Sequence, residues 1–172
     1  MNVPTPGLHS FLSERVADRD LTPAEAGELA AELAARRDLW QHLVRHSDDE
    51  RIYTSIYRDH HLDVWLICWN QRQETGLHDH DLSGGAVHVV EGELDEDRLG
   101  LGRGIDTTRY GPGQSFTFDP SRIHDVRHAG DTPTVSLHLY SPPLWRMGHY
   151  EAGADGRLSR RSASYAEELR AS

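Results

Sequence analysis

The chain has 172 residues, which is enough for one domain with its own core. Its formal net charge of −10 argues against a nucleic-acid partner and against an anionic membrane surface. A single cysteine excludes an intrachain disulfide, and no apolar run approaches the roughly 20 residues that cross a bilayer. Residues 1–10 lack the pattern of a signal peptide, so we expect a cytoplasmic protein without membrane contact.

The first 47 residues have a helical pattern. Thr22 is a suitable N-cap, with Pro23 at the first helical position and Glu25 at the third. Leucines recur at roughly helical spacing from Leu29 to Leu43. We therefore expect two or three helices in an N-terminal segment, residues 1–50, that packs on the rest of the chain.

From residue 51 the pattern changes to short strands separated by turns rich in glycine and proline. The run 64–69 is apolar throughout, which indicates a strand buried on both faces. Seven or eight such strands favour a mainly β fold, a sandwich or small barrel, over residues 51–152. Residues 153–172 are expected to form a C-terminal tail with a short helix near 165–169. The other predicted strands are 52–57, 86–90, 115–118 and 134–140, and the predicted turns are 99–104 and 110–114.

The pentad Gly-Leu-His-Asp-His over residues 76–80 indicates a metal site. Alternate side chains of a strand share one face, so His78 and His80 lie together and Asp79 points away from the metal, as a supporting or solvent-facing group. Neutral imidazole is a suitable ligand for zinc, copper, iron and nickel. Glycines at 84 and 85 stand where an acidic third ligand could have followed, so another ligand must come from elsewhere.

His124 is the candidate for that third ligand. It follows a turn at Pro120 and starts the next strand, and distant strands of a small barrel face each other across its interior. Other histidines are expected to be structural or exposed, namely His60, His61, His88 and His149.

A second group of polar residues alternates along the predicted strand 134–140. Strand parity places Ser136, His138 and Tyr140 on one face, where a hydroxyl, an imidazole and a phenol in line can form a hydrogen-bonded relay. The alternative is a polar face turned to solvent, with Leu137 and Leu139 as ordinary core residues. Alternation alone does not decide between the two.

In combination, these motifs resemble the thiol dioxygenases of the cysteine dioxygenase type, within the cupin superfamily. The resemblance implies a cupin-type small β-barrel, or jelly roll, with one Fe2+ per chain held by His78, His80 and His124. It also implies that the protein oxidises a small thiol, cysteine or a related mercapto acid, to its sulfinate with O2. The family is often monomeric, so a monomer or weak dimer is expected. The matching segments lie within about residues 53–145 and are 68–69, 76–80 with Ser83, 91–92, 123–126 and 135–143.

The resemblance also assigns roles around the metal. Tyr140 would lie beside the bound thiol and oxygen, positioned by His138, which Ser136 positions in turn. Three neutral ligands would leave the ferrous site with its full positive charge, which favours an anionic thiolate. The bond from Ser141 to Pro142 is expected to be cis, as in the family.

The chain departs from the animal enzymes at two positions. Gly85 stands where they have a cysteine that is crosslinked to the motif tyrosine, so no crosslink is expected. An ungapped alignment places Tyr53 where the family has an arginine that binds the substrate carboxylate. A gapped alignment brings Arg58 into that role instead, although its strand parity differs from that of Tyr53. Arg51 and Arg146 are further candidates for this anchor.

Two other classes of function are compatible with the sequence. A metal cupin could use zinc, manganese or nickel as a Lewis acid, because a three-histidine site also suits zinc with an activated water. A small-ligand-binding cupin without activity is the third hypothesis, but a binder does not need the relay of Ser136, His138 and Tyr140. Cys68 lies in an apolar run with no neighbouring base, which favours a structural thiol over a nucleophile.

Overall fold

The computed structural model describes residues 6–100, 104–153 and 157–164, so the predicted helix at 165–169 lies outside the described residues. Two helices, α1 (Pro6–Ser13) and α2 (Pro23–Ala35), are followed by the short 3-10 helices η1 (Arg37–Leu39) and η2 (Gln41–Leu43). The predicted cap is confirmed, since the Thr22 side chain and the Glu25 side chain each accept a hydrogen bond from the other's backbone. No helix in the described part of the chain has the length and apolar character to span a membrane.

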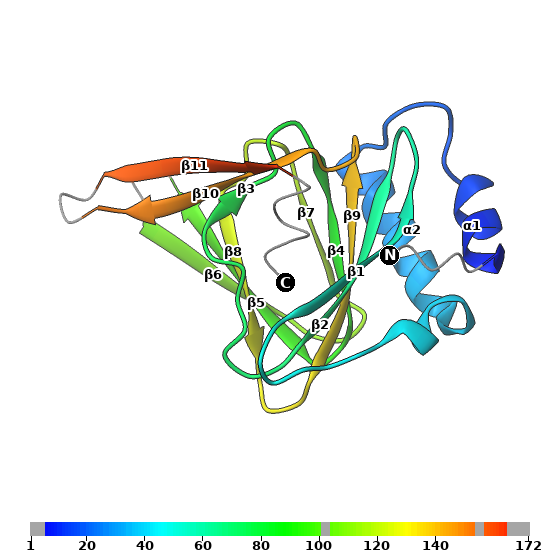
Figure 1. The fold of residues 1–172 in the computed structure, drawn as a ribbon, viewed down its shortest axis with the longest axis horizontal. Coiled ribbons are helices and arrows are strands. Elements are labelled where there is room, and N and C mark those ends of the chain that lie inside the picture. Colours follow the sequence, from blue (N-terminus) through cyan, green and yellow to red (C-terminus); the bar gives the residue numbers. More distant parts are fainter. Residues whose placement is uncertain (1–5, 101–103, 154–156, 165–172) are drawn as a thin grey trace.

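The strands form two antiparallel sheets that face each other, as Figure 1 shows. One sheet has five strands in the order β1-β2-β9-β4-β7, and α2 packs on its outer face. Its strands are β1 (Ile52–Arg58), β2 (Asp63–Trp69), β4 (Gly84–Glu91), β7 (Ser115–Phe118) and β9 (Thr134–Ser141). These correspond to the five strands predicted from apolar and alternating runs.

The other sheet has six strands in the order β11-β10-β3-β8-β5-β6. Most of its strands carry charged or small residues, so their sequences lack the apolar pattern on which the predictions depended. The structure also differs from the expected C-terminal tail, because residues 158–164 form a strand paired with the one before it. The strands are β3 (His78–Asp79), β5 (Glu93–Gly100), β6 (Gly104–Tyr110), β8 (His124–Ala129), β10 (Arg146–Ala152) and β11 (Leu158–Ser164).

The mainly β fold with N-terminal helices is therefore confirmed, and the five-stranded sheet is buried on both sides. Alternate residues of β2 belong to two cores: Leu66 packs with the helices, whereas Trp65 and Ile67 face the space between the sheets. The outward-facing leucines of β9, Leu137 and Leu139, also pack with the helices. The expected cis bond between Ser141 and Pro142 is present.

A bulge in β1 changes which residues of that strand face the interior. Tyr53 pairs with Ile67, but the register shifts between Ser55 and Tyr57, and Arg58 then pairs with Asp63. Since Asp63 and Ile67 are on the same face of β2, the bulge turns Arg58 to the same face as Tyr53. The expectation that Arg58 has the wrong parity is therefore wrong, because the extra residue of the bulge resets the alternation.

Candidate metal centre

The structure brings the three predicted metal ligands together in the interior. His78 and His80 flank Asp79 at the two-residue strand β3, and His124 begins β8 directly opposite His78. All three are buried, and one ligand nitrogen from each lies within 4.8 Å of the others. The short β3 thus needs the neighbouring strands β8 and β10 to hold it in place.

Hydrogen bonds fix the orientation of two of these rings. The Nδ1 atom of His78 lies 2.9 Å from the carbonyl oxygen of Gly76, and that of His124 lies 2.9 Å from a carboxylate oxygen of Glu96. Each Nδ1 therefore carries the proton, and each Nε2 presents a lone pair. This is the arrangement in which metal-ligating histidines are usually found, with the second nitrogen bonded to a carbonyl or carboxylate.

The spacing of the inner nitrogens suits a metal ion. The Nε2 atoms of His78 and His80 are 3.2 Å apart, and adjacent ligands on a metal with bonds of about 2.1 Å lie about 3 Å apart. The buried Nε2 of His124 has no hydrogen-bond partner among the described residues. Burial, and then the neighbouring histidines, hold the pKa values of His78 and His80 well below their usual range, so both rings are neutral. The residues therefore fit a divalent metal ion bound by three imidazole nitrogens.

Asp79 points away from this centre, as its strand parity predicts, but it is buried rather than solvent-facing. Arg160 of β11 donates two hydrogen bonds to its carboxylate, at 2.7 and 2.8 Å, and Tyr150 of β10 donates a third at 2.6 Å. Burial acts to raise the pKa of Asp79, but these hydrogen bonds outweigh it and hold the pKa well below its usual value. The carboxylate thereby ties β3 to the hairpin of β10 and β11.

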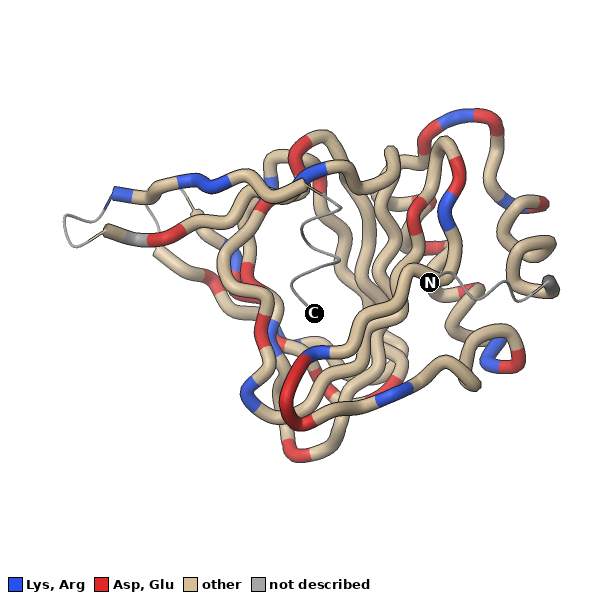
Figure 2. The backbone as a smooth tube through the Cα atoms, in the orientation of Figure 1, with Lys and Arg blue, Asp and Glu red and all other residues tan. Residues whose placement is uncertain are grey.

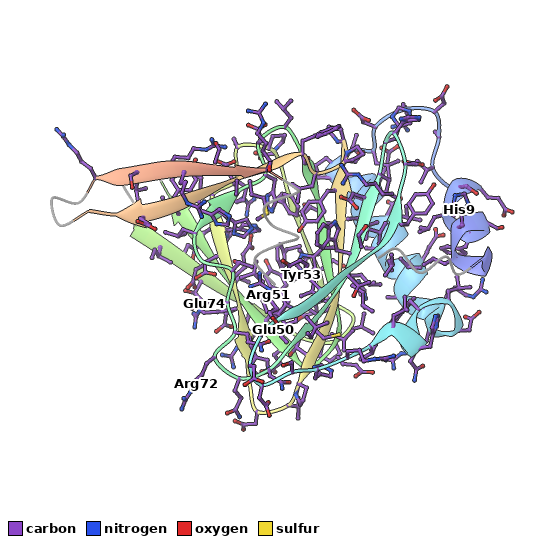
Figure 3. The ribbon with its side chains drawn as sticks, viewed as in Figure 1. His9, Glu50, Arg51, Tyr53, Arg72 and Glu74 are labelled. Atoms are coloured by element: carbon purple, nitrogen blue, oxygen red, sulfur yellow. The ribbon has the colours of Figure 1, made fainter. Side chains whose placement is uncertain are left out.

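A small cavity opens beside the three histidines. It has a volume of about 60 Å³, room for only a few water-sized groups at the usual 10–15 Å³ each. Apolar side chains share its wall with the three histidines and with further polar side chains, among them those on β1, β9 and β10. Figure 3 shows Arg51 and Tyr53 pointing between the two sheets, where β1 begins. The other lining residues are Trp65, Ile67, Thr75, Val87, Phe118, Val126, His138, Tyr140, Leu144, Met147 and His149.

The polar residues of β9 form the relay that their alternation allows. The Ser136 oxygen lies 2.9 Å from Nε2 of His138, and the Tyr140 hydroxyl lies 3.4 Å from Nδ1 of the same ring. The indole N–H of Trp69 donates to the Ser136 oxygen at 2.9 Å. All eight residues of β9 are buried, so the alternative of a polar face turned to solvent is excluded.

The direction of the relay depends on which nitrogen of His138 carries the ring proton. Burial, and then the charge of Arg51, lower the pKa of His138 to about 3, so the ring is neutral at physiological pH. The Ser136 hydroxyl can accept from Trp69 and donate its own proton to Nε2 of His138; the ring proton is then on Nδ1 and faces the Tyr140 oxygen. In this tautomer the phenol oxygen of Tyr140 accepts from His138, and its own proton is directed elsewhere.

The other candidate anchors do not line the cavity. The guanidinium of Arg58 contacts the buried carboxylate of Asp63 and donates to the carbonyl of Leu144 at 3.0 Å. Arg146 is exposed at the start of β10. Of the arginines considered from the sequence, the structure thus brings Arg51 to the metal centre together with Tyr53.

Some residues of the site were missed or placed differently by the sequence analysis. Glu96 lies behind His124, but an acidic stretch such as 93–97 is typical of a solvated surface. His149 was expected to be structural or exposed, whereas it lines the cavity and pairs with His78 across β10 and β3. His88 is buried and bonds Ser115, which agrees with a structural role.

Comparisons with known proteins identify the family of the chain. A model of the family described as cysteine dioxygenase type I matches residues 8–152. A curated relative, cysteine dioxygenase type 1 of Danio rerio, is 29% identical over 105 residues, which are 51% of this chain and 52% of the relative. The chain thus matches about half the length of that relative.

Solved structures with low sequence identity share the fold. A protein of Thermus thermophilus superposes with a TM-score of 0.53 at 18% identity, covering 59% of this chain and 92% of its own. A conserved Klebsiella pneumoniae protein with a double-stranded β-helix domain gives a TM-score of 0.52 at 18% identity, covering 70% of this chain and 91% of its own. These likenesses confirm the expected cupin-type barrel.

Proposed function

Because the chain belongs to the cysteine dioxygenase type I family, we propose that it is a mononuclear non-haem iron dioxygenase that oxidises a small thiol to its sulfinate. The observation that carries the proposal is the meeting of two groups at one small cavity. Three buried histidine nitrogens converge on one side, and the relay of Ser136, His138 and Tyr140 forms part of its wall. A binding protein does not need the relay.

Each part of the chain would have a defined task. His78, His80 and His124 would hold one Fe2+ per chain. Bound ferrous iron supplies the oxygen chemistry, in which both atoms of O2 are added to the thiol sulfur. The cavity would exclude water and hold the thiol close to the histidines, so that proximity supplies much of the rate.

Tyr140 would donate a hydrogen bond to the substrate or to oxygen. With the ring proton of His138 on Nδ1, the Tyr140 oxygen accepts from His138, and its own proton can be directed at a ligand. The ring of Tyr140 lies 5.2 Å from that of His80, centroid to centroid, which brings the phenol beside the metal ligands. His138 and Ser136 would act as positioning residues behind it.

We infer that Arg51, with Tyr53, binds an anionic group of the thiol. Arg51 lines the cavity, and its positive charge reaches the centre, since after burial it is the largest cause of the lowered pKa of His138. Tyr53 adds a single hydroxyl to the same wall. Arg58 is a weaker candidate for the anchor, because its guanidinium is already paired with Asp63.

The first test is oxygen uptake by the iron-loaded protein with a panel of small thiols, including cysteine and mercapto acids, with the sulfinate identified by mass spectrometry. Tyr140→Phe should lower kcat by roughly 100-fold, as the loss of one preorganised donor usually does. If no thiol supports oxygen uptake, or if activity follows zinc rather than iron, the proposal is refuted.

The anchor has its own test. Arg51→Gln should raise KM for a mercapto acid by about 10-fold or more, with little change for a thiol that has no acidic group, because only the acid loses a charge-assisted pair. Arg72→Gln, in the exposed turn after β2, is the matched control and should change neither value. An unchanged KM in the Arg51 variant would contradict the assignment.

The proposal extends to the protein's setting. A monomer or weak dimer in the cytoplasm is proposed, with O2 and the thiol as its small-molecule partners. The one cysteine, Cys68, is buried and unlinked, which is compatible with a reducing compartment. Burial raises the pKa of its thiol, so it stays protonated and takes no part in the chemistry.

A further inference from the structure

A buried carboxylate lies directly behind one of the three histidines. Glu96 is on β5, and its side chain is 1% exposed. One of its oxygens lies 2.9 Å from Nδ1 of His124 and 3.3 Å from a guanidinium nitrogen of Arg122. Its strand neighbours Asp95 and Asp97 point to the other face, where they pair with arginines. Strand alternation thus directs Glu96 alone of these three acids into the barrel.

A charged carboxylate is not needed merely to orient the ring of His124. His78 is oriented by a backbone carbonyl, that of Gly76, at the same distance of 2.9 Å. A neutral acceptor would therefore suffice for His124 as well. Burying a carboxylate costs free energy unless its partners compensate for it, yet the second oxygen of Glu96 has no hydrogen-bond partner among the described residues. Arg122 is itself only partly buried, and it contacts the same oxygen as His124.

We propose that Glu96 is a positioning residue that also tunes the metal centre by its charge. It accepts the Nδ1–H of His124, which holds Nε2 towards the metal and makes the imidazole a stronger electron donor. The three histidines are then electrically unequal, because a negative charge lies one hydrogen bond behind one of them. The inference rests on the proposed function, and it revises the expectation that neutral ligands leave the ferrous ion with its full positive charge.

Two variants separate orientation from charge. Glu96→Gln keeps an acceptor for Nδ1–H and removes the charge, whereas Glu96→Leu removes both. Binding of Co2+ alone, measured by titration of the metal-free protein, should weaken by about 10-fold in the first variant and by up to about 100-fold in the second, the range usual for such supporting groups. In the iron-loaded protein, both variants should raise the ferric/ferrous reduction potential, because less negative charge stabilises the ferric state.

Asp97→Asn is the matched control, since it removes a carboxylate from the same strand on the opposite face and should leave Co2+ affinity unchanged. Circular dichroism of each metal-free variant checks that it is folded; should Glu96→Leu not fold, the near-isosteric Glu96→Gln decides the question. If Glu96→Gln equals the wild type in both Co2+ affinity and potential, the charge has no role and the proposal is overturned.

The Glu96 proposal and the proposed dioxygenase function can fail independently of each other. A wild-type protein that binds Co2+ and responds to Glu96→Gln but oxidises no thiol supports the Glu96 proposal and refutes the dioxygenase. If the wild type oxidises a thiol but Glu96→Gln changes neither Co2+ affinity nor the reduction potential, the dioxygenase proposal is supported and the Glu96 proposal is refuted. A wild-type protein that binds no divalent metal refutes both.

Discussion

In the five-stranded sheet every residue of β2 and β9 is buried, whereas in the six-stranded sheet β6 is exposed along most of its length. Figure 2 shows the same contrast in charge: acidic and basic residues follow the six-stranded sheet and the loops, and the central strands of the other sheet carry few. The two walls of the cavity are therefore stabilised by different kinds of interaction. One is held by apolar packing against α2, and the other by ion pairs such as that of Asp97 with Arg127.

The contrast explains where each part of the site lies. The relay on β9 lies in a dry wall, where hydrogen bonds are strong and a neutral imidazole is favoured. The metal ligands lie on the six-stranded sheet, here called the polar sheet, whose outer side supplies Arg160 to the carboxylate of Asp79. A charged group can therefore support β3 from behind, which the apolar wall could not offer.

The largest difference between the sheets should appear on truncating apolar side chains. Leu137→Ala in β9 removes a fully buried side chain and should cost about 2–5 kcal/mol of unfolding free energy. Ile105→Ala in β6, where the side chain is 59% exposed, should change it by no more than about 0.5 kcal/mol. Urea unfolding of both variants measures this, and equal losses would contradict the contrast.

Two glycines offer a second comparison. A Cβ at Gly85 of β4 would lie 1.9 Å from the carbonyl oxygen of Leu139, so β4 and β9 would have to separate. A Cβ at Gly148 of β10 would meet the Arg160 guanidinium at 2.2 Å, which can move aside. Gly85→Ala should therefore lower the free energy of unfolding by about 1–3 kcal/mol, as overpacking usually does. Gly148→Ala should lower it by less.

Thermal unfolding of the two metal-free variants tests this order. Gly148→Ala should instead weaken Co2+ binding, because displacing Arg160 frees Asp79 and with it β3. A Gly85 variant as stable as the wild type would show that the two strands adapt.

The dry wall should also make stability depend on pH. The pKa of His138 is about 3 in the folded protein against 6.5 when exposed, so between these values the unfolded chain takes up a proton that the native state excludes. Stability is thus fully present above about pH 6.5 and falls with decreasing pH, by up to about 1.4 kcal/mol per unit for one such group. Denaturant unfolding of metal-free wild type and His138→Gln from pH 7 to 5 should give a shallower fall in the variant. If the free energies of unfolding of the two proteins fall in parallel with pH, His138 is not the group responsible.

The smallest effect is expected from an ion pair on the polar sheet. Arg98 of β5 contacts Asp106 of β6 at 2.7 Å, and the aspartate side chain is 75% exposed. Asp106→Asn should lower the free energy of unfolding, measured with urea, by no more than about 1 kcal/mol. The difference should disappear in high salt, because exposed pairs are screened. A larger loss that persists in salt would mean that single ion pairs, and not only their sum, hold this sheet.

Local patterns in the sequence were enough for the apolar half of the fold. Continuous or alternating apolar residues predicted all five strands of the sheet that packs against α2, and Thr22 with Glu25 predicted the helix cap. The polar sheet was largely missed because its strands depend on pairing with distant neighbours. In β5, for example, ion pairs with Arg109 and Arg127 replace the apolar face that would have revealed a strand.

The sequence by itself determined which side chains share a face, because alternation along a strand is a local property. It thereby paired His78 with His80, and Ser136 with His138 and Tyr140. Tertiary structure decided what those faces meet: His124 opposite His78, Glu96 behind His124, and Arg51 rather than Arg58 in the cavity wall. These depend on strand register, a bulge and ion pairing between distant segments, which are settled only when the two sheets close around a common interior.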